Sequence, residues 1–263
     1  MTVQSAVKGV DELAPQLANC RAYWLGWGAA GRSDDDLAHY RSGLAHTQLN
    51  GVLRLRDEAG AAQALARART ALAGVPWLWW VAPDSAPGTV DLLAREGFER
   101  VGAMPVMAVA LDRVAEVPTP PGVEIEVLEG TDPATCGEWV RTYGPSFGVG
   151  PELVDASVRI EEDWAKDPRA VRFVARADGR AVGTALLFDA HGVAGVYIVA
   201  TAEAYRRRGI GAALTAAALA EGRRRGLHVG TLQASSLGAS VYAGMGFEKV
   251  AEYELFRPPT TWN

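Results

Sequence analysis

The chain has 263 residues, of which 49% are hydrophobic and 22% charged, with a formal net charge of −5 at pH 7. This composition is that of a globular protein with one large domain or two ordinary ones, and it excludes a disordered or collagen-like chain. No stretch approaches the ~20 apolar residues of a membrane span, and no basic start precedes an apolar core, so we expect neither a membrane partner nor a signal peptide. The negative charge argues against a nucleic-acid partner.

The metal-ligating residue types are sparse. Two cysteines, Cys20 and Cys136, lie too far apart to indicate a disulfide framework or a metal site, which predicts a cytoplasmic protein without a bound metal. We expect no nucleophilic role for Cys136, which has no histidine near it in sequence. The four histidines show no metal-ligand spacing: His39, His46, His191 and His228.

In chain order, the first clear elements are an alanine-rich helix over 60–74 and an apolar strand over 75–83. Trp77, Trp79 and Trp80 belong to this strand and are expected to be buried. The run EVPTPPG, from Glu116 to Gly122, holds three prolines and a glycine and continues neither a helix nor a central strand. We therefore predict a domain over 1–116, a linker over 117–122 and a second domain over 123–263.

The second domain has a clear predicted order. A strand over 123–128 precedes a helix capped by Thr131 or Asp132, and a second helix lies between Pro151 and Pro168. The segment 171–192 indicates a hairpin with ADGR as its turn. A further strand over 193–201 enters the run YRRRGIGAAL, which opens a long helix.

A repeat relates the two parts of the chain. Gly97-Phe98-Glu99 and Gly246-Phe247-Glu248 are 149 residues apart, and in both copies an apolar strand and an alanine-rich helix precede them. A match in three successive elements predicts two related α/β units.

The arginine-glycine run follows a strand and opens a helix, an arrangement whose free backbone amides and positive dipole end bind phosphates. The run does not match a dinucleotide fingerprint, because Ala212, Ala213 and Leu214 follow Gly211 and the third glycine is missing. It does not match a Walker loop either, because Gly-Lys-Ser/Thr is absent. A nucleic-acid patch lacks interleaved aromatic residues. A solvated helix entry remains the alternative to a phosphate site.

The run IVATAEAYRRRGIGAALT resembles the signature of the GNAT superfamily of acetyl-CoA-dependent N-acetyltransferases, here as Arg206-x-x-Gly209-x-Gly211. A second family mark is Tyr242 in VYAGMGF, and the resemblance covers about 122–258. It implies an α/β (α+β) fold of two GNAT-like units, each a mixed, largely antiparallel sheet flanked by helices.

The resemblance also implies roles for individual residues. The N–H of Val199 is expected to polarise the thioester carbonyl, and Thr201 and Ser235 to bind the pantetheine arm of acetyl-CoA. Tyr242 is the expected general acid for the departing thiolate. The loop expected to hold the pyrophosphate comprises Arg206, Arg207, Arg208, Gly209, Ile210, Gly211 and Ala212.

The sequence leaves the identity of the general base open. Relatives often carry a glutamate four residues before the oxyanion position, which falls here on Gly195. Candidate bases are Asp189 and His191 in the preceding turn and Glu138 on a helix, and Tyr143 and Asp163 are further possibilities. A water chain or an amine that arrives neutral would also serve.

The N-terminal copy is predicted to have lost the cofactor loop. Asp57, Glu58 and Ala59 stand opposite the three arginines, and Ala62 and Leu93 stand opposite Gly211 and Tyr242. Carboxylates at this place would repel a pyrophosphate. We expect this unit to pack against the active one and help shape an acceptor cleft.

The predicted function is transfer of acetyl from acetyl-CoA to a primary amine of a small molecule. Alternatives are a longer acyl donor, acyl-CoA decarboxylation, an aminoacyl-tRNA donor, or a non-catalytic acyl-CoA-binding module. A monomer, as a pseudo-dimer of the two units, and a homodimer are both compatible with the sequence.

Overall fold

The computed structural model describes residues 7–262. By the contacts between its residues the chain divides into two compact units. Unit 1 consists of the described residues up to Asn19 together with Met107–Val250, and unit 2 consists of Cys20–Val106 together with the residues from Ala251 onward. The two domains predicted from the sequence, over 1–116 and 123–263, have other boundaries than these units, and that division stays a prediction.

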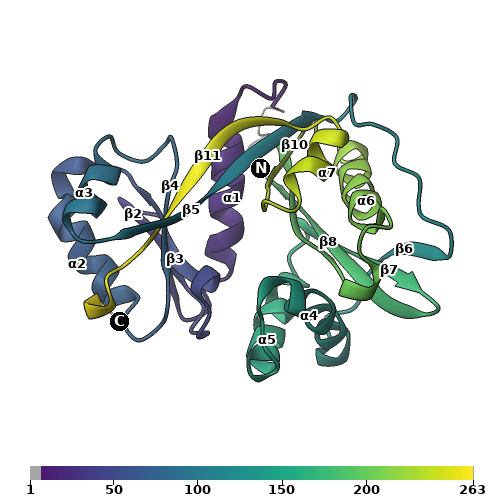
Figure 1. The fold of residues 1–263 in the computed structure, drawn as a ribbon, viewed down its shortest axis with the longest axis horizontal. Helices are drawn as coiled ribbons and strands as arrows, with labels where there is room; N and C mark the ends of the chain where they lie inside the picture. The colour runs from purple at the N-terminus through teal and green to yellow at the C-terminus, as the bar shows by residue number, and fades with distance from the viewer. Residues whose placement is uncertain (1–6, 263) are drawn as a thin grey trace. The chain divides into compact units, whose positions relative to one another are not determined.

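Unit 1 is a sheet flanked by helices (Figure 1). Its strands follow the order β5-β10-β9-β8-β7-β6; the pairs from β6 to β9 are antiparallel, and β9 with β10 is parallel. Its own elements are β6 (Val123–Val127), α4 (Pro133–Phe147), α5 (Val154–Trp164), β7 (Ala170–Ala177), β8 (Arg180–Ala190), β9 (Val193–Thr201), α6 (Ile210–Arg224), β10 (Val229–Gln233) and α7 (Ala239–Gly244).

Unit 2 repeats the scheme with strand order β1-β2-β3-β4-β11. The pairs β1–β2, β2–β3 and β4–β11 are antiparallel, and β3–β4 is parallel. Its elements are β1 (Gly31–Ser33), β2 (Leu37–Arg41), β3 (Asn50–Leu55), α2 (Ala61–Ala71), β4 (Leu78–Val81) and α3 (Thr89–Arg95). Helix α1 (Leu13–Gly26) and strands β5 (Glu99–Ala110) and β11 (Glu248–Arg257) contribute residues to both units. The predicted fold class is confirmed.

Local chemistry explains why the predicted elements form. Asp132 caps α4, because its Oδ1 accepts hydrogen bonds from the N–H groups of Ala134 and Thr135 at 3.0 Å. Asp178 and Gly179, at the centre of the ADGR turn, have φ angles of 50° and 74°. These left-handed values match the twist of a two-residue hairpin, so the turn joins β7 to β8 as predicted.

The core of unit 1 lies between the sheet and α6. Ile210, Leu214 and Ala218 recur every four residues on one face of α6 and are at most 1% exposed. They pack in one cluster with strand residues that include Leu187 and Val196. This apolar contact fixes the direction of α6, and therefore the place of its first turn relative to β9.

The repeat has the same order of elements in both copies. Helix, strand, short helix and strand appear as α2-β4-α3-β5 and as α6-β10-α7-β11. Ala61 and Ile210, which begin the two long helices, are 149 residues apart, as are Glu99 and Glu248 at the start of the last strands.

Helix α1 was not among the predicted elements. Its Pro15 stands in the first turn, where a missing N–H does no harm. Gln16 and Asn19 of this helix are fully buried in unit 1.

The aromatic core of unit 2 confirms the burial expected for Trp77, Trp79 and Trp80, which are at most 1% exposed. Trp77 contacts Phe98 at 5.7 Å between ring centroids. Trp262, near the end of the chain, reaches the same cluster and lies 5.2 Å from the ring of Phe98.

We expect Trp262→Ala to lower the free energy of unfolding by about 1–3 kcal/mol, because it removes ring contacts to Trp77 and Phe98. Urea denaturation followed by circular dichroism measures the effect. Trp262→Phe keeps an aromatic ring and should lose less than half as much. Equal stability of the alanine variant and the unaltered protein would contradict this packing.

Candidate functional site

Strand β9 carries a bulge near its end. Thr184 pairs with Ala200 and Leu186 with Tyr197, so β9 holds one more residue than β8 over this stretch. Ile198 takes up the irregularity with a φ of 51°, a rare conformation for a β-branched residue. The buried hydroxyl of Thr184 donates to the Ile198 carbonyl at 2.7 Å and holds the bulge in place. Such strain is typical of functional sites.

The pairing of β9 with β10 ends before the bulge. Their parallel pairing among the described residues covers Gly230 with Ala194 and Thr231 with Gly195. Beyond these pairs, β9 continues to Thr201 and β10 to Gln233. The structure thus opens the sheet at Val199, where the sequence predicts an oxyanion donor.

The loop after β9 presents unused backbone amides. Within the described part of the chain, the N–H groups from Arg207 to Ala212 donate to no protein acceptor. We call these six amides the anion cradle. Arg207 and Gly209 both have positive φ angles, 59° and 83°, so the chain turns sharply before α6 begins at Ile210. Alternating conformations of this kind point successive N–H groups at one anion.

The arginines mainly brace the loop. Arg206 donates from Nε to the Thr201 carbonyl at 3.2 Å, and Arg208 donates to the Ala204 carbonyl at 3.0 Å. The Arg208 guanidinium also lies 5.0 Å from the ring centroid of Tyr205. All three arginines are exposed and add positive charge beside the cradle.

The first turn of α6 faces the end of β9. A Cβ atom built on Gly211 would lie 3.6 Å from the Thr201 hydroxyl oxygen and 3.9 Å from a Val199 methyl group. The predicted residues Val199, Thr201 and Gly211 therefore meet at one place.

Tyr242 lies in α7, with its ring 5.7 Å from that of Phe247 and packed on the core of unit 1. Burial raises the pKa of its hydroxyl to about 12, and a hydrogen bond with Thr215 opposes this shift. Thr215 belongs to α6 and donates to the Gly211 carbonyl at 2.9 Å. Tyr242 therefore reaches the first turns of α6 as a protonated phenol at neutral pH.

Ser235 is exposed beside this tyrosine, and its Oγ accepts from the Gly238 N–H at 3.2 Å. A Cβ built on Gly238 would lie 2.9 Å from a ring carbon of Tyr242 and 3.4 Å from the Ser235 Oγ. The two predicted residues thus flank the same glycine.

The two turn candidates for the base lie at the other end of β9. Asp189 pairs with Ala194, five residues before Val199, which is about 16 Å along a strand. Its carboxylate accepts from Arg225 at 3.5 Å. His191 lies farther still, in the β8–β9 turn with a φ of 56°. Neither is within the reach of direct proton transfer at Val199.

Glu138 on α4 forms a two-pronged ion pair with Arg176 at 2.8 and 2.9 Å. The hydrogen bonds from Arg176 lower the pKa of this carboxyl. An ion-paired carboxylate of low pKa is a poor proton acceptor near neutrality.

Sequence reasoning missed Glu161, a buried carboxylate on α5 that is 1% exposed. Burial raises its pKa to about 7, against the opposing effects of Tyr143, Arg172 and Trp139. Within the described residues its Oε2 has no hydrogen-bond partner. The apolar periodicity of α5 gives no signal for it, because the helix around it is amphipathic and acidic.

In unit 2 the position equivalent to the cradle is occupied by the chain itself. Asp57 accepts from the Ala59 N–H at 3.0 Å, so a carboxylate takes the place of an outside anion. This contact agrees with the predicted loss of the phosphate loop, which stays a prediction.

No cluster of three or more histidine, cysteine, aspartate or glutamate side chains able to hold a metal ion occurs in residues 7–262. Over the same range, no helix is long and apolar enough to cross a membrane.

The model of the Acetyltransferase (GNAT) family matches residues 137–247, from α4 to the residue after Gly246. This chain contains a GNAT domain. The match includes the bulge, the cradle and Tyr242, and it confirms the resemblance seen in the sequence.

A curated relative of this chain is mycothiol acetyltransferase of Clavibacter michiganensis subsp. michiganensis (strain NCPPB 382). It is 31% identical over 164 residues, which are 59% of this chain and 52% of the relative. The chain thus matches about half the length of that protein.

Solved structures share the fold over nearly the whole chain. A GCN5-related N-acetyltransferase from Kribbella flavida superposes with a TM-score of 0.69 and 21% identity, covering 92% of this chain and 95% of that one. A tandem GNAT protein from the clavulanic acid biosynthesis pathway gives a TM-score of 0.61 at 16% identity, covering 95% and 97%. At these identities the likeness concerns the fold, and it agrees with two GNAT-like units.

We expect the stability of the protein to fall as pH rises from about 4.5 to 7, because the folded state keeps a proton on Glu161 that the unfolded state releases. The raised pKa corresponds to about 3 kcal/mol over this window. Glu161→Gln should remove that part of the decline, as measured by urea denaturation at pH 5 and pH 8. Asp163→Asn, on the same helix at an exposed position, is the control; parallel pH profiles for all three proteins would contradict the assignment.

Proposed function

We propose that unit 1 transfers an acetyl group from acetyl-CoA to the primary amine of a small molecule by direct transfer. The anion cradle carries this proposal: six free amides at the start of α6 suit a pyrophosphate, and they lie beside Val199, Thr201 and Tyr242. The relative named mycothiol acetyltransferase supports acetyl as the transferred group.

The residues present fit the donor along its length. The cradle from Arg207 to Ala212 would bind the pyrophosphate, and Gly209 and Gly211 keep side chains out of its path. Thr201 and Ser235 would bond the pantetheine arm where β9 and β10 part. When bound, acetyl-CoA supplies an activated acyl group as its thioester.

Two groups of the chain would act on the thioester. The Val199 N–H would donate to the carbonyl oxygen and stabilise the negative charge that develops there. The Tyr242 hydroxyl would donate its proton to the departing sulfur. Because burial raises its pKa to about 12, the phenol stays protonated through about pH 10 and remains able to donate.

This chain has no carboxylate to accept the proton of the amine at the position where relatives often carry a glutamate. Gly195 occupies it, and the predicted candidates Asp189, His191 and Glu138 are remote or ion-paired. We therefore infer that the amine is taken up neutral or loses its proton through a water chain. Turnover would then rise with pH toward the pKa of the amine.

The proposal is tested by calorimetry with acetyl-CoA and by thiol release over a panel of primary amines. Absence of acetyl-CoA binding would overturn it. Binding with no thiol release on any amine would leave an acyl-CoA-binding module in its place.

We expect Tyr242→Phe to lower kcat by about 100-fold or more and to leave the Kd of acetyl-CoA within about twofold, because only proton donation is removed. Steady-state thiol release and calorimetry measure the two quantities. Unchanged turnover would remove Tyr242 from the role of general acid.

We expect Gly209→Ala to raise the Kd of coenzyme A at least tenfold, because its φ of 83° is strained for alanine and the cradle depends on it. Gly226→Ala is the matched control: it has a φ of 82° at the other end of α6. Both variants should lose about 1–2 kcal/mol of stability. Equal weakening of coenzyme A binding in the two variants would refute the cradle.

A further inference from the structure

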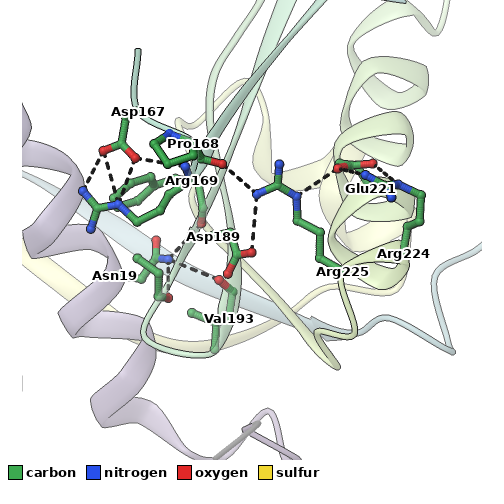
Figure 2. A network of polar contacts seen from close by, with 11 residues as sticks. Asn19, Asp167, Pro168, Arg169, Asp189, Val193, Glu221, Arg224 and Arg225 are labelled. Carbon is green, nitrogen blue, oxygen red and sulfur yellow. Dashed lines mark hydrogen bonds and ion pairs between the residues drawn. The ribbon is translucent and has the colours of Figure 1, made fainter. Parts of the chain in front are cut away.

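Asn19 is a fully buried amide whose hydrogen bonds all reach the β8–β9 hairpin. Its Nδ2 donates to the carbonyls of Phe188, Ala190 and Val193 at 3.0, 2.8 and 3.3 Å. Its Oδ1 accepts from the Tyr197 hydroxyl at 2.7 Å. Figure 2 shows the amide beside the turn that joins the two strands.

We propose that Asn19 is a positioning residue for acetyl transfer, which holds β9 so that Val199 faces the thioester. The proposal rests on the function proposed above. An amide side chain takes up no proton near neutrality, so the role is geometric.

The link from Asn19 to Val199 is short. Tyr197 pairs with Leu186 directly before the bulge, two residues from Val199. Tyr197 is 6% exposed, and its hydroxyl donates to the Asn19 Oδ1 at 2.7 Å. A shift of Tyr197 would therefore move the start of the bulge and re-aim the Val199 N–H.

The hairpin is also held from α6. Arg225 donates to the Asp189 carboxylate at 3.5 Å and to the Pro168 carbonyl at 3.1 Å, and Glu221 holds the same guanidinium at 2.9 Å (Figure 2). The Asp189 N–H donates to the Arg169 carbonyl at 2.8 Å. Since α6 also begins with the cradle, these contacts tie the turn to the element that would bind the donor. Asn19 adds hydrogen bonds from α1 to the same hairpin.

Gly195 makes room for this arrangement. A Cβ built there would overlap the Asn19 Oδ1 and lie 2.6 Å from a ring carbon of Tyr197. A glycine inside a buried strand marks such a close approach. The glutamate that relatives often carry at this position is therefore incompatible with Asn19 and Tyr197 as they stand.

Two variants separate positioning from folding. Asn19→Ala is expected to lower kcat about 100-fold, the effect of a misplacement near 1 Å, with the Kd of coenzyme A within about twofold. Tyr197→Phe removes one hydroxyl, should fold normally, and should lower kcat about tenfold. Amide hydrogen exchange over 196–200 should become at least about tenfold faster in both.

The matched control is Asn50→Ala in unit 2. Asn50 is also fully buried, and its Nδ2 donates to the carbonyls of Leu44, His46 and Pro76 at 2.9, 3.0 and 3.0 Å. Its loss should lower Tm as much as Asn19→Ala and leave kcat unchanged. Equal losses of kcat in Asn19→Ala and Asn50→Ala, or none in Tyr197→Phe, would overturn the proposal.

The two proposals fail in different ways. Absence of turnover in the unaltered protein would refute the proposed function. Unchanged exchange over 196–200 in Asn19→Ala would refute the positioning role even where the unaltered protein is active.

Discussion

The bulge at Ile198 is the constraint on which the site depends. A β-branched residue enters the left-handed region, with a φ of 51°, because the Thr184 hydroxyl holds its carbonyl and the sheet encloses it. The bulge lies after the last β9–β10 pair, in the part of β9 that approaches the first turn of α6. Val199 and Thr201 then meet Gly211, and the loop between them can leave its amides unpaired.

The two units place loops of different charge at equivalent positions of similar folds. In both units, a loop and an alanine-rich helix follow a strand that holds the equivalent place in its sheet: β3 before α2, and β9 before α6. In unit 1 the loop has free amides beside arginines, and in unit 2 Asp57 accepts from the Ala59 N–H. The difference is one of charge and of amide use, because the helices begin at equivalent residues. The proposed function therefore depends on the loop, and the fold alone does not supply it.

Buried polar groups in unit 1 divide into paired and unpaired ones. Asn19 makes four hydrogen bonds and stabilises a hairpin, since a satisfied buried amide costs little. Glu161 is enclosed with an unpaired oxygen, and its pKa rises to about 7 as a result. The first sets geometry, and the second makes stability sensitive to pH. Both lie outside the run IVATAEAYRRRGIGAALT that carries the resemblance in the sequence.

The sequence by itself determined what short-range patterns encode: the ADGR turn, a helix cap at Thr131 or Asp132, the long helix opened by YRRRGIGAAL, the repeat of 149 residues and the glycines of the cradle. These depend on neighbours within a few residues, or on comparing one stretch with another. Only the tertiary structure decided the bulge at Ile198, the burial of Glu161 and the meeting of Asn19 with Tyr197, which are 178 residues apart. No local period records such contacts, because they depend on which elements pack together. Gly195 is a sign of the contact with Asn19 that the sequence does contain. A glycine inside a strand indicates a close neighbour, and the structure shows that this neighbour is Asn19.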